Sequence, residues 1–134
     1  MKILILCTGN SCRSQMAEGF FRYYAKDKAD IFSAGLEAHG LNEKAVMVMK
    51  EIGIDISSHQ SKTLEQFIGT SFDYILTVCD HADEHCPYFP GNAKRIHQSF
   101  PDPAKAQGTE KEIMGEFRKV RDLINKYSQE FLFA

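Results

Sequence analysis

The sequence predicts an α/β protein of three layers, with a four-stranded parallel sheet and helices on both of its faces. Short apolar, β-rich runs alternate with segments whose apolar residues recur at helical spacing, as in folds built from strand–helix–strand units. The chain of 134 residues suits one domain, residues 1–134, because it shows neither a linker nor an internal repeat.

The first half of the chain is expected to hold two strands and two helices. Lys2–Leu6 (KILIL) fits a buried parallel strand, and Asp30–Ala34 fits a second one. Between them a helix is expected from Ser14, a residue that suits an N-cap. One apolar face of this helix carries Met16, Ala17, Phe20, Phe21 and Tyr24. A further helix is expected between the cap Asn42 and Gly53.

The second half of the chain continues the alternation. A polar connection over Asp55–Lys62 leads into a short helix over Thr63–Phe67. The clearest strand after the first is Phe72–Val78 (FDYILTV), and Lys94–His97 is a weaker candidate. The last and longest helix is expected over Glu110–Phe133, where apolar residues repeat at steps of three and four.

The composition excludes several classes of protein. A net charge of -2 and a pI of about 6.2 argue against nucleic acid as the main partner. No apolar run approaches the roughly 20 residues of a membrane-spanning helix, and the N-terminal stretch lacks the cleavage site of a signal peptide. We therefore expect a cytoplasmic monomer with no membrane contact.

The four cysteines are the feature that most needs explaining. They are Cys7, Cys12, Cys79 and Cys86. A domain that buries about two thirds of its unfolded surface needs no disulfides to fold. Cys7 follows the first strand directly, and Cys79 follows the third. Because ligands of such sheets bind beyond the carboxyl ends of the strands, these two thiols are expected at one binding edge.

The loop after the first strand has the composition of an oxyanion site. It reads CTGNSCRS, and its candidate anion-binding residues are Thr8, Gly9, Asn10, Ser11, Cys12, Arg13 and Ser14. Backbone N–H groups between a strand and a helix start favour an anion, and Arg13 can hold two of its oxygens. The same positive field is expected to lower the pKa of Cys7 and make it a nucleophile. The alternative is a buried cysteine beside an ordinary loop.

Other residues of this loop have subsidiary roles in this interpretation. Gly9 can adopt a backbone conformation closed to most residues. Ser14 could donate a hydrogen bond to the Cys7 sulfur, whereas Asn10 carries no charge and is expected to hold the shape of the loop. Cys12 has no assignable role, since a free cysteine often behaves as a small apolar residue.

Cys79 and Cys86 lie in a loop with six residues between them. A disulfide requires their Cα atoms within about 7 Å, whereas a helical segment would hold them roughly 10 Å apart, so oxidation would need the segment to bend or uncoil. Two alternatives remain open. Together with His81 and His85 the cysteines could bind zinc, or they could be unrelated surface thiols.

Asp102 precedes a proline in the loop before the last helix. A residue in that position is held extended, which suits a positioned general acid, although aspartate is also common there in simple turns. The sequence alone leaves both interpretations open.

Three segments resemble a known family. CTGNSCRS is similar to the phosphate-binding loop of low-molecular-weight tyrosine phosphatases and of the arsenate reductases built on the same fold. TVCDHADEHCP and DPAKAQGTE resemble the thioredoxin-coupled arsenate reductases in particular. The resemblance implies the fold of those phosphatases, and it implies conversion of arsenate to arsenite in arsenic detoxification.

The resemblance also implies roles for individual residues. Cys7 attacks arsenate held by Arg13, Asp102 is the general acid, and Cys79 and Cys86 relay the oxidation as successive disulfides. Thioredoxin is the implied external reductant, a glutaredoxin being the alternative, and no cofactor or metal is implied.

Two other functions remain open. One is a low-molecular-weight phosphatase in which the second cysteine pair is regulatory or incidental. Against it, Ala104 stands where such phosphatases carry an aromatic residue, which favours a small inorganic substrate. The other is a non-catalytic thiol sensor or metal-binding protein.

Some relatives bind potassium beside the loop. The corresponding positions here are Asn10, Glu18, Ser33 and, in place of an aspartate, Lys62. Because a lysine cannot bind a cation, we expect its ammonium group to replace the potassium ion beside Glu18, unless Lys62 is merely a solvated charge.

Overall fold

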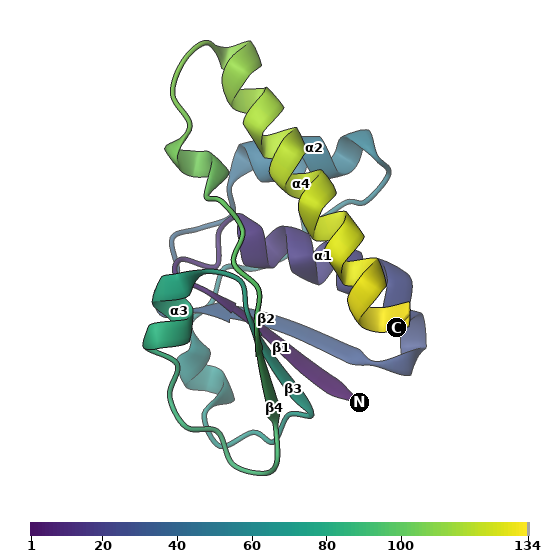
Figure 1. Cartoon of the computed structure of the whole chain (residues 1–134), viewed down its shortest axis with the longest axis vertical. Helices are drawn as coiled ribbons and strands as arrows, with labels where there is room; N and C mark the ends of the chain where they lie inside the picture. Colours follow the sequence, from purple (N-terminus) through teal and green to yellow (C-terminus); the bar gives the residue numbers. More distant parts are fainter. Residues whose placement is uncertain (134) are drawn as a thin grey trace.

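The computed structural model, which describes residues 1–133, has a central sheet of four parallel strands (Figure 1). The strands are β1 (Lys2–Cys7), β2 (Asp30–Gly35), β3 (Tyr74–Thr77) and β4 (Lys94–His97), in the order β2-β1-β3-β4. The predicted α/β class and the four predicted strands are confirmed. β1 pairs with both β2 and β3, so the carboxyl ends of these strands meet at one edge of the sheet.

Within residues 1–133, four α-helices and three 3₁₀ helices connect and follow the strands. The α-helices are α1 (Arg13–Ala25), α2 (Glu43–Glu51), α3 (Asp80–Glu84) and α4 (Glu110–Phe133). The 3₁₀ helices are η1 (Lys26–Lys28), η2 (Leu64–Phe67) and η3 (Pro103–Lys105). The Asn42 side chain caps α2 as predicted, because its Oδ1 accepts hydrogen bonds from the amides of Lys44 and Ala45.

Two local predictions were wrong. Helix α1 begins at Arg13 with Cys12 as its N-cap, and Ser14 is fully buried inside the first turn. The segment after β3, predicted as a loop, contains the short helix α3, whose Ala82 is buried. A helix of this length is too short to show an apolar periodicity.

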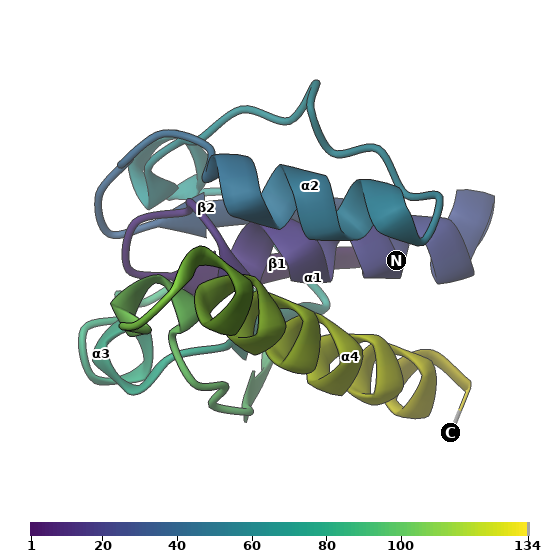
Figure 2. The same cartoon turned by 90° about the horizontal axis from the view of Figure 1, so that it is seen from above.

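One face of the sheet is covered by the long helices. α1 packs on β1 and β2 and also against α4, and α2 packs on α4 on the side away from the sheet (Figures 1 and 2). Phe20, Phe21 and Phe117 are among the largest fully buried side chains of this layer. This packing holds the first turn of α1, and with it the preceding loop, at a fixed place on the sheet.

The other face has a thinner cover of short elements. It is formed by α3, η2 and an aromatic cluster of Phe32, Phe67, Phe72 and Phe89, whose neighbouring ring centroids are 5.6–6.0 Å apart. Helical segments therefore lie on both faces, as predicted, although they are unequal in size. Within residues 1–133 no helix combines the length and apolar character needed to cross a membrane.

Gly35 permits the close approach of β2 to the loop after β1. A Cβ at this position would lie 2.7 Å from the Thr8 carbonyl oxygen and 2.7 Å from the Asn10 amide nitrogen. Gly35→Ala is therefore expected to lower the free energy of unfolding by about 1–3 kcal/mol, because backbone atoms cannot yield as a flexible side chain can. Denaturant unfolding monitored by circular dichroism measures the change.

Gly115→Ala is the matched control. Gly115 lies in α4 with no atom near its missing Cβ. The added methyl group is expected to stabilise the protein by about 0.5–1 kcal/mol through helix propensity. Equal effects of the two substitutions would contradict the close approach at Gly35.

Candidate active site

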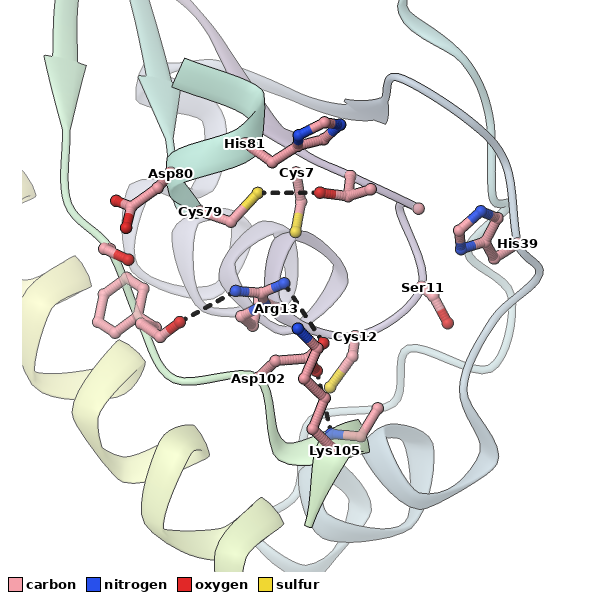
Figure 3. Close-up of a pocket in the computed structure, with 15 residues that line it drawn as sticks. Cys7, Ser11, Cys12, Arg13, His39, Cys79, Asp80, His81, Asp102 and Lys105 are labelled. Carbon is pink, nitrogen blue, oxygen red and sulfur yellow. Dashed lines mark hydrogen bonds and ion pairs between the residues drawn. The ribbon is translucent and has the colours of Figure 1, made fainter. Parts of the chain in front are cut away.

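A cavity of about 680 Å³ opens at the carboxyl edge of the sheet (Figure 3). Cys7 ends β1, and Cys79 lies two residues after β3, so the sheet brings both thiols into this cavity. Its lining residues are Cys7, Thr8, Gly9, Ser11, Cys12, Arg13, His39, Cys79, Asp80, His81, Ser99, Phe100, Asp102, Ala104 and Lys105. The predicted meeting of Cys7 and Cys79 at one edge is confirmed.

Asn10 holds the anion loop, residues 7–14, in shape as predicted. Its side chain is fully buried, and its amide donates hydrogen bonds to the hydroxyls of Ser14 and Ser33, each at 2.9 Å. Its Oδ1 accepts from the Lys62 amide at 2.9 Å and from Gln15 Nε2 at 3.0 Å. These bonds offset the cost of a left-handed backbone, φ 46°, at a residue other than glycine.

Several expectations for this loop need correction. The left-handed conformation belongs to Asn10, whereas Gly9 is needed because a Cβ would lie 2.7 Å from His39 Cγ. Neither Asn10 nor Ser14 lines the cavity. Ser14 Oγ accepts a hydrogen bond from Asn10, and among residues 1–133 it makes none with the Cys7 sulfur. The side chains of Asn10 and Ser14 therefore lie beneath the loop and hold it in shape, away from the cavity in which an anion would bind.

Arg13 and Asp102 lie together in the cavity, as Figure 3 shows. Arg13 Nη1 donates to the Phe100 carbonyl at 3.0 Å, and Nη2 lies 3.6 Å from Asp102 Oδ2. The Asp102 carboxylate accepts a hydrogen bond from the Ala104 amide at 3.0 Å as the cap of η3. The sequence analysis correctly placed both residues at the site, and it missed the second cation of the lining, Lys105.

The thiols of Cys7 and Cys79 lie next to each other in the cavity, and each changes the pKa of the other. The neighbouring Cys7 thiol lowers the pKa of Cys79, and Thr8 Oγ1, 3.3 Å from the Cys79 sulfur, acts in the same direction. Cys79 and burial raise the pKa of Cys7, and Arg13 opposes that rise. The ionisation therefore belongs to the pair, whereas the sequence pattern predicted a low pKa for Cys7 alone.

Cys12 is a protonated, buried thiol. It lines the cavity, but burial raises its pKa to about 12, and the nearby carboxylate of Asp102 adds to the rise. A thiol with this pKa is a poor nucleophile at neutral pH. This agrees with the sequence analysis, which found no role for Cys12.

Cys86 is half-buried and lies outside the cavity, with α3 between it and Cys79. Arg95 of β4 donates to the Cys86 sulfur at 2.8 Å and to the carbonyls of Cys86 and Pro87. Burial raises the pKa of Cys86, and Arg95 opposes this. All four cysteines are free, so the predicted disulfides remain predictions. The contact with Arg95 could not be predicted from the sequence, because it depends on pairing between β3 and β4.

Glu18 lies buried at the centre of a charged network behind the loop. Ser33 Oγ donates to it, Arg22 Nε is 2.8 Å away, and Lys62 Nζ is 3.9 Å away. Burial lowers the pKa of Lys62, and Glu18 opposes this shift. The expected position of the Lys62 ammonium beside Glu18 is confirmed.

Comparisons with known proteins agree with this geometry. The family model described as low molecular weight phosphotyrosine protein phosphatase matches residues 2–134. The chain is 53% identical to an arsenate reductase of Halalkalibacterium halodurans and 50% identical to one of Bacillus subtilis. Each match covers 96% of this chain and 93% of the relative.

Solved structures show the same fold. An arsenate reductase in the phosphate-binding state superposes with a TM-score of 0.79 at 28% identity, covering 97% of this chain and 95% of that one. A low molecular weight protein tyrosine phosphatase from T. tengcongensis gives a TM-score of 0.81 at 27% identity, with coverages of 99% and 98%.

The mutual effect of the two thiols can be tested by titrating the reduced protein. We expect one thiolate of the pair to form below the ordinary pKa of a thiol, measured by its ultraviolet absorbance. Cys79→Ala should change this transition, whereas Cys86→Ala should retain it. The pKa of Cys7 should fall in Cys79→Ala, because the neighbour that raises it is lost. A thiol titration that is unchanged in Cys79→Ala would contradict this effect.

Because the Lys62 ammonium group lies beside Glu18, we predict that potassium ions do not stabilise the protein. Replacing sodium by potassium should leave the melting temperature unchanged, because the place beside Glu18 already holds a positive charge. Lys62→Met should lower the melting temperature by leaving the buried Glu18 less compensated. Lys50→Met, on an exposed position of α2, is the matched control and should have little effect. A marked rise of the wild-type melting temperature in potassium would refute this.

Proposed function

The chain belongs to the low molecular weight phosphotyrosine protein phosphatase family, and we propose that within this family it is an arsenate reductase regenerated by thioredoxin. One observation above all supports this: a second thiol, Cys79, lies beside the Cys7 thiol of the anion loop in the same cavity. A phosphatase needs one thiol there. Reduction of arsenate takes two electrons, which a pair of thiols can supply.

The anion loop suits a small tetrahedral dianion. Arg13 faces the cavity beside Cys7, and Lys105 adds a second positive charge to the lining. Ala104 leaves the cavity without an aromatic wall at that position. Relatives at about half identity are named arsenate reductases, which supports the same substrate.

The first step needs the thiolate on Cys7. The Arg13 guanidinium favours this state, because it acts to lower the pKa of Cys7. The Cys7 sulfur then attacks arsenic, and Asp102 protonates the departing hydroxyl, which leaves as water. Arg13 neutralises charge on the arsenate oxygens during this step.

The second step is the reduction itself. Cys79 gives up its proton and attacks the Cys7 sulfur, so an S–S bond forms as the S–As bond breaks. The electron pair of that bond stays on arsenic and converts it to the trivalent state. Overall, hydrogen arsenate, two thiols and two protons give arsenous acid, one disulfide and water.

The third step transfers the disulfide from the Cys7–Cys79 pair to Cys79 and Cys86, of which Cys86 lies outside the cavity. Cys86 attacks Cys79, Cys7 leaves as a thiolate, and a Cys79–Cys86 disulfide remains. Because α3 separates these two cysteines, this step requires the helix to uncoil. Thioredoxin then reduces the exposed disulfide in a dithiol exchange. This cycle fits a monomer in the reducing cytoplasm and needs no cofactor.

The decisive assay is arsenate-dependent oxidation of reduced thioredoxin. We expect turnover in the wild type and in the control Lys50→Met, whose changed residue is exposed on α2 and does not line the cavity. Cys86→Ser should stop after a single turnover with a Cys7–Cys79 disulfide, identified by peptide mapping without reduction. Sustained turnover by Cys86→Ser would overturn the relay.

Residual phosphatase activity is the second candidate, because phosphate and arsenate share shape and charge. Hydrolysis of an aryl phosphate should be measured in parallel. If it survives in Cys79→Ser while the wild type reduces no arsenate, the protein is a phosphatase and the proposal is wrong.

Arg95 is proposed as a positioning residue for Cys86. Arg95→Gln should slow the transfer of the disulfide from Cys7–Cys79 to Cys79–Cys86 by about tenfold, because a charge-assisted bond to the sulfur is lost. Rapid quenching followed by peptide mapping measures this step. The pH profile of the step should move to higher pH, since Arg95 holds the pKa of Cys86 down.

Arg118→Gln is the control for charge removal, because Arg118 pairs with Glu51 of α2 away from the cysteines. It should leave the transfer rate and its pH profile unchanged. Equal slowing in both variants would argue against the role of Arg95.

A further inference from the structure

We propose that His81, Glu84 and His85 form a binding site for a divalent cation of the zinc class on the exposed side of α3, and that the bound ion holds this helix folded. The effect of the ion on α3 rests on the proposed function, because α3 separates Cys79 from Cys86, the two cysteines of the relay.

The three side chains already converge. One ligand atom of each lies within 4.8 Å of the others, and the two imidazole rings are 4.4 Å apart between centroids. The spacing of four residues puts both histidines on one side of a helical turn. Their exposure lets small rotations close the remaining distance to a zinc ion, which binds imidazole at about 2.0–2.1 Å.

Within residues 1–133, His81 and His85 differ from the other histidines in that their side chains make no hydrogen bond or ion pair, although His81 also lines the edge of the active-site cavity. His39 contacts Glu37, His59 contacts Gln15, and His97 contacts Thr77 and Asp80. Among the side-chain hydrogen bonds and ion pairs of residues 1–133, none involves His81, Glu84 or His85.

The surroundings of the cluster favour a cation. The short helix also carries Asp80 and Asp83, and it contains no lysine or arginine. Neutral imidazole suits zinc, copper, nickel and cobalt, whereas carboxylates alone would suit magnesium or calcium. Two imidazoles, one carboxylate and water would therefore make a tetrahedral site for an ion of the zinc class.

The ligand set differs from the one considered from sequence, in which Cys79 and Cys86 joined the two histidines. Cys79 is buried and faces Cys7 and Thr8, and the Cys86 sulfur contacts Arg95. Glu84 takes their place beside the imidazoles.

The site couples metal binding to the shape of α3. The amide of His85 donates to the His81 carbonyl at 3.2 Å, so the ligands stay together only while this turn persists. A ligand that binds only the folded helix lowers the ratio of uncoiled to folded helix by a factor of 1 + [L]/Kd, where [L] is the free ligand concentration. At a concentration about 100 times its Kd the depletion is about a hundredfold. Bound metal should therefore slow formation of the Cys79–Cys86 disulfide.

The site is tested first with Co²⁺ alone, added to the reduced full-length protein. We expect a d–d spectrum without a thiolate-to-cobalt charge-transfer band. The affinity should be at least tenfold weaker in His85→Asn and several-fold weaker in Glu84→Gln, and it should be unchanged in His39→Asn, the matched control. Circular dichroism checks that each variant folds. A thiolate band, or equal affinity in His85→Asn and the wild type, would overturn the site.

The coupling is tested with Zn²⁺ and the oxidant diamide, in the absence of arsenate. Diamide takes two electrons and two protons from Cys79 and Cys86 and becomes a hydrazine, so the test is independent of arsenate reduction. Saturating Zn²⁺ should slow this disulfide at least tenfold in the wild type and have little effect in His85→Asn. Equal slowing in both would mean that zinc acts on the thiols, which overturns the coupling. If arsenate reduction alone fails, only the proposed function falls.

Discussion

The placement of Cys7 next to Cys79 is the constraint on which the chemistry of this site depends. Parallel pairing of β1 with β3 brings the two residues to one edge of the sheet, although they lie far apart along the chain. Each thiol changes the pKa of the other, so the two ionise as a pair. In the proposed cycle this pair supplies first a nucleophile for an oxyanion and then a thiolate that attacks a sulfur. Arg13 stabilises both states because it acts on both thiols.

The loop beneath Cys7 and Cys79 must be rigid, and the Asn10 side chain holds it in shape. An amide can donate and accept at once, so it links the loop to α1, to β2 and to the segment at Lys62 without placing another charge beneath the anion. The Glu18 carboxylate there lies between two cations, Arg22 at 2.8 Å and Lys62 at 3.9 Å. Its negative charge is therefore compensated within the layer below the loop.

The sequence predicted the parts of this molecule that depend on local pattern. The four strands and the limits of the last helix follow from apolar periodicity, and the meeting of Cys7 and Cys79 follows from the topology of a parallel sheet. The distribution of charge between the two thiols could not be predicted, because it depends on a contact across two strands. The contact of Arg95 with Cys86 is hidden for the same reason. α3 was missed because five residues are too few to display a helical repeat.

The shortness of α3 also explains how a relay can pass through it. Isolated helices of fewer than about 12 residues are marginal in water, so a helix of this length persists through its tertiary contacts. For α3 these contacts are the burial of Ala82, a hydrogen bond from Thr77 to Asp83 at 3.3 Å, and a contact of 2.8 Å between Asp80 and His97 of β4. Uncoiling therefore exposes little apolar surface, and its cost is small compared with disruption of the sheet. A small cost makes the segment responsive to any ligand that favours one of its two shapes. A disulfide between Cys79 and Cys86 favours the uncoiled shape, and an ion between His81 and His85 would favour the folded one. Disulfide formation and metal binding would then favour opposite shapes of the same helical turn, so each would disfavour the other.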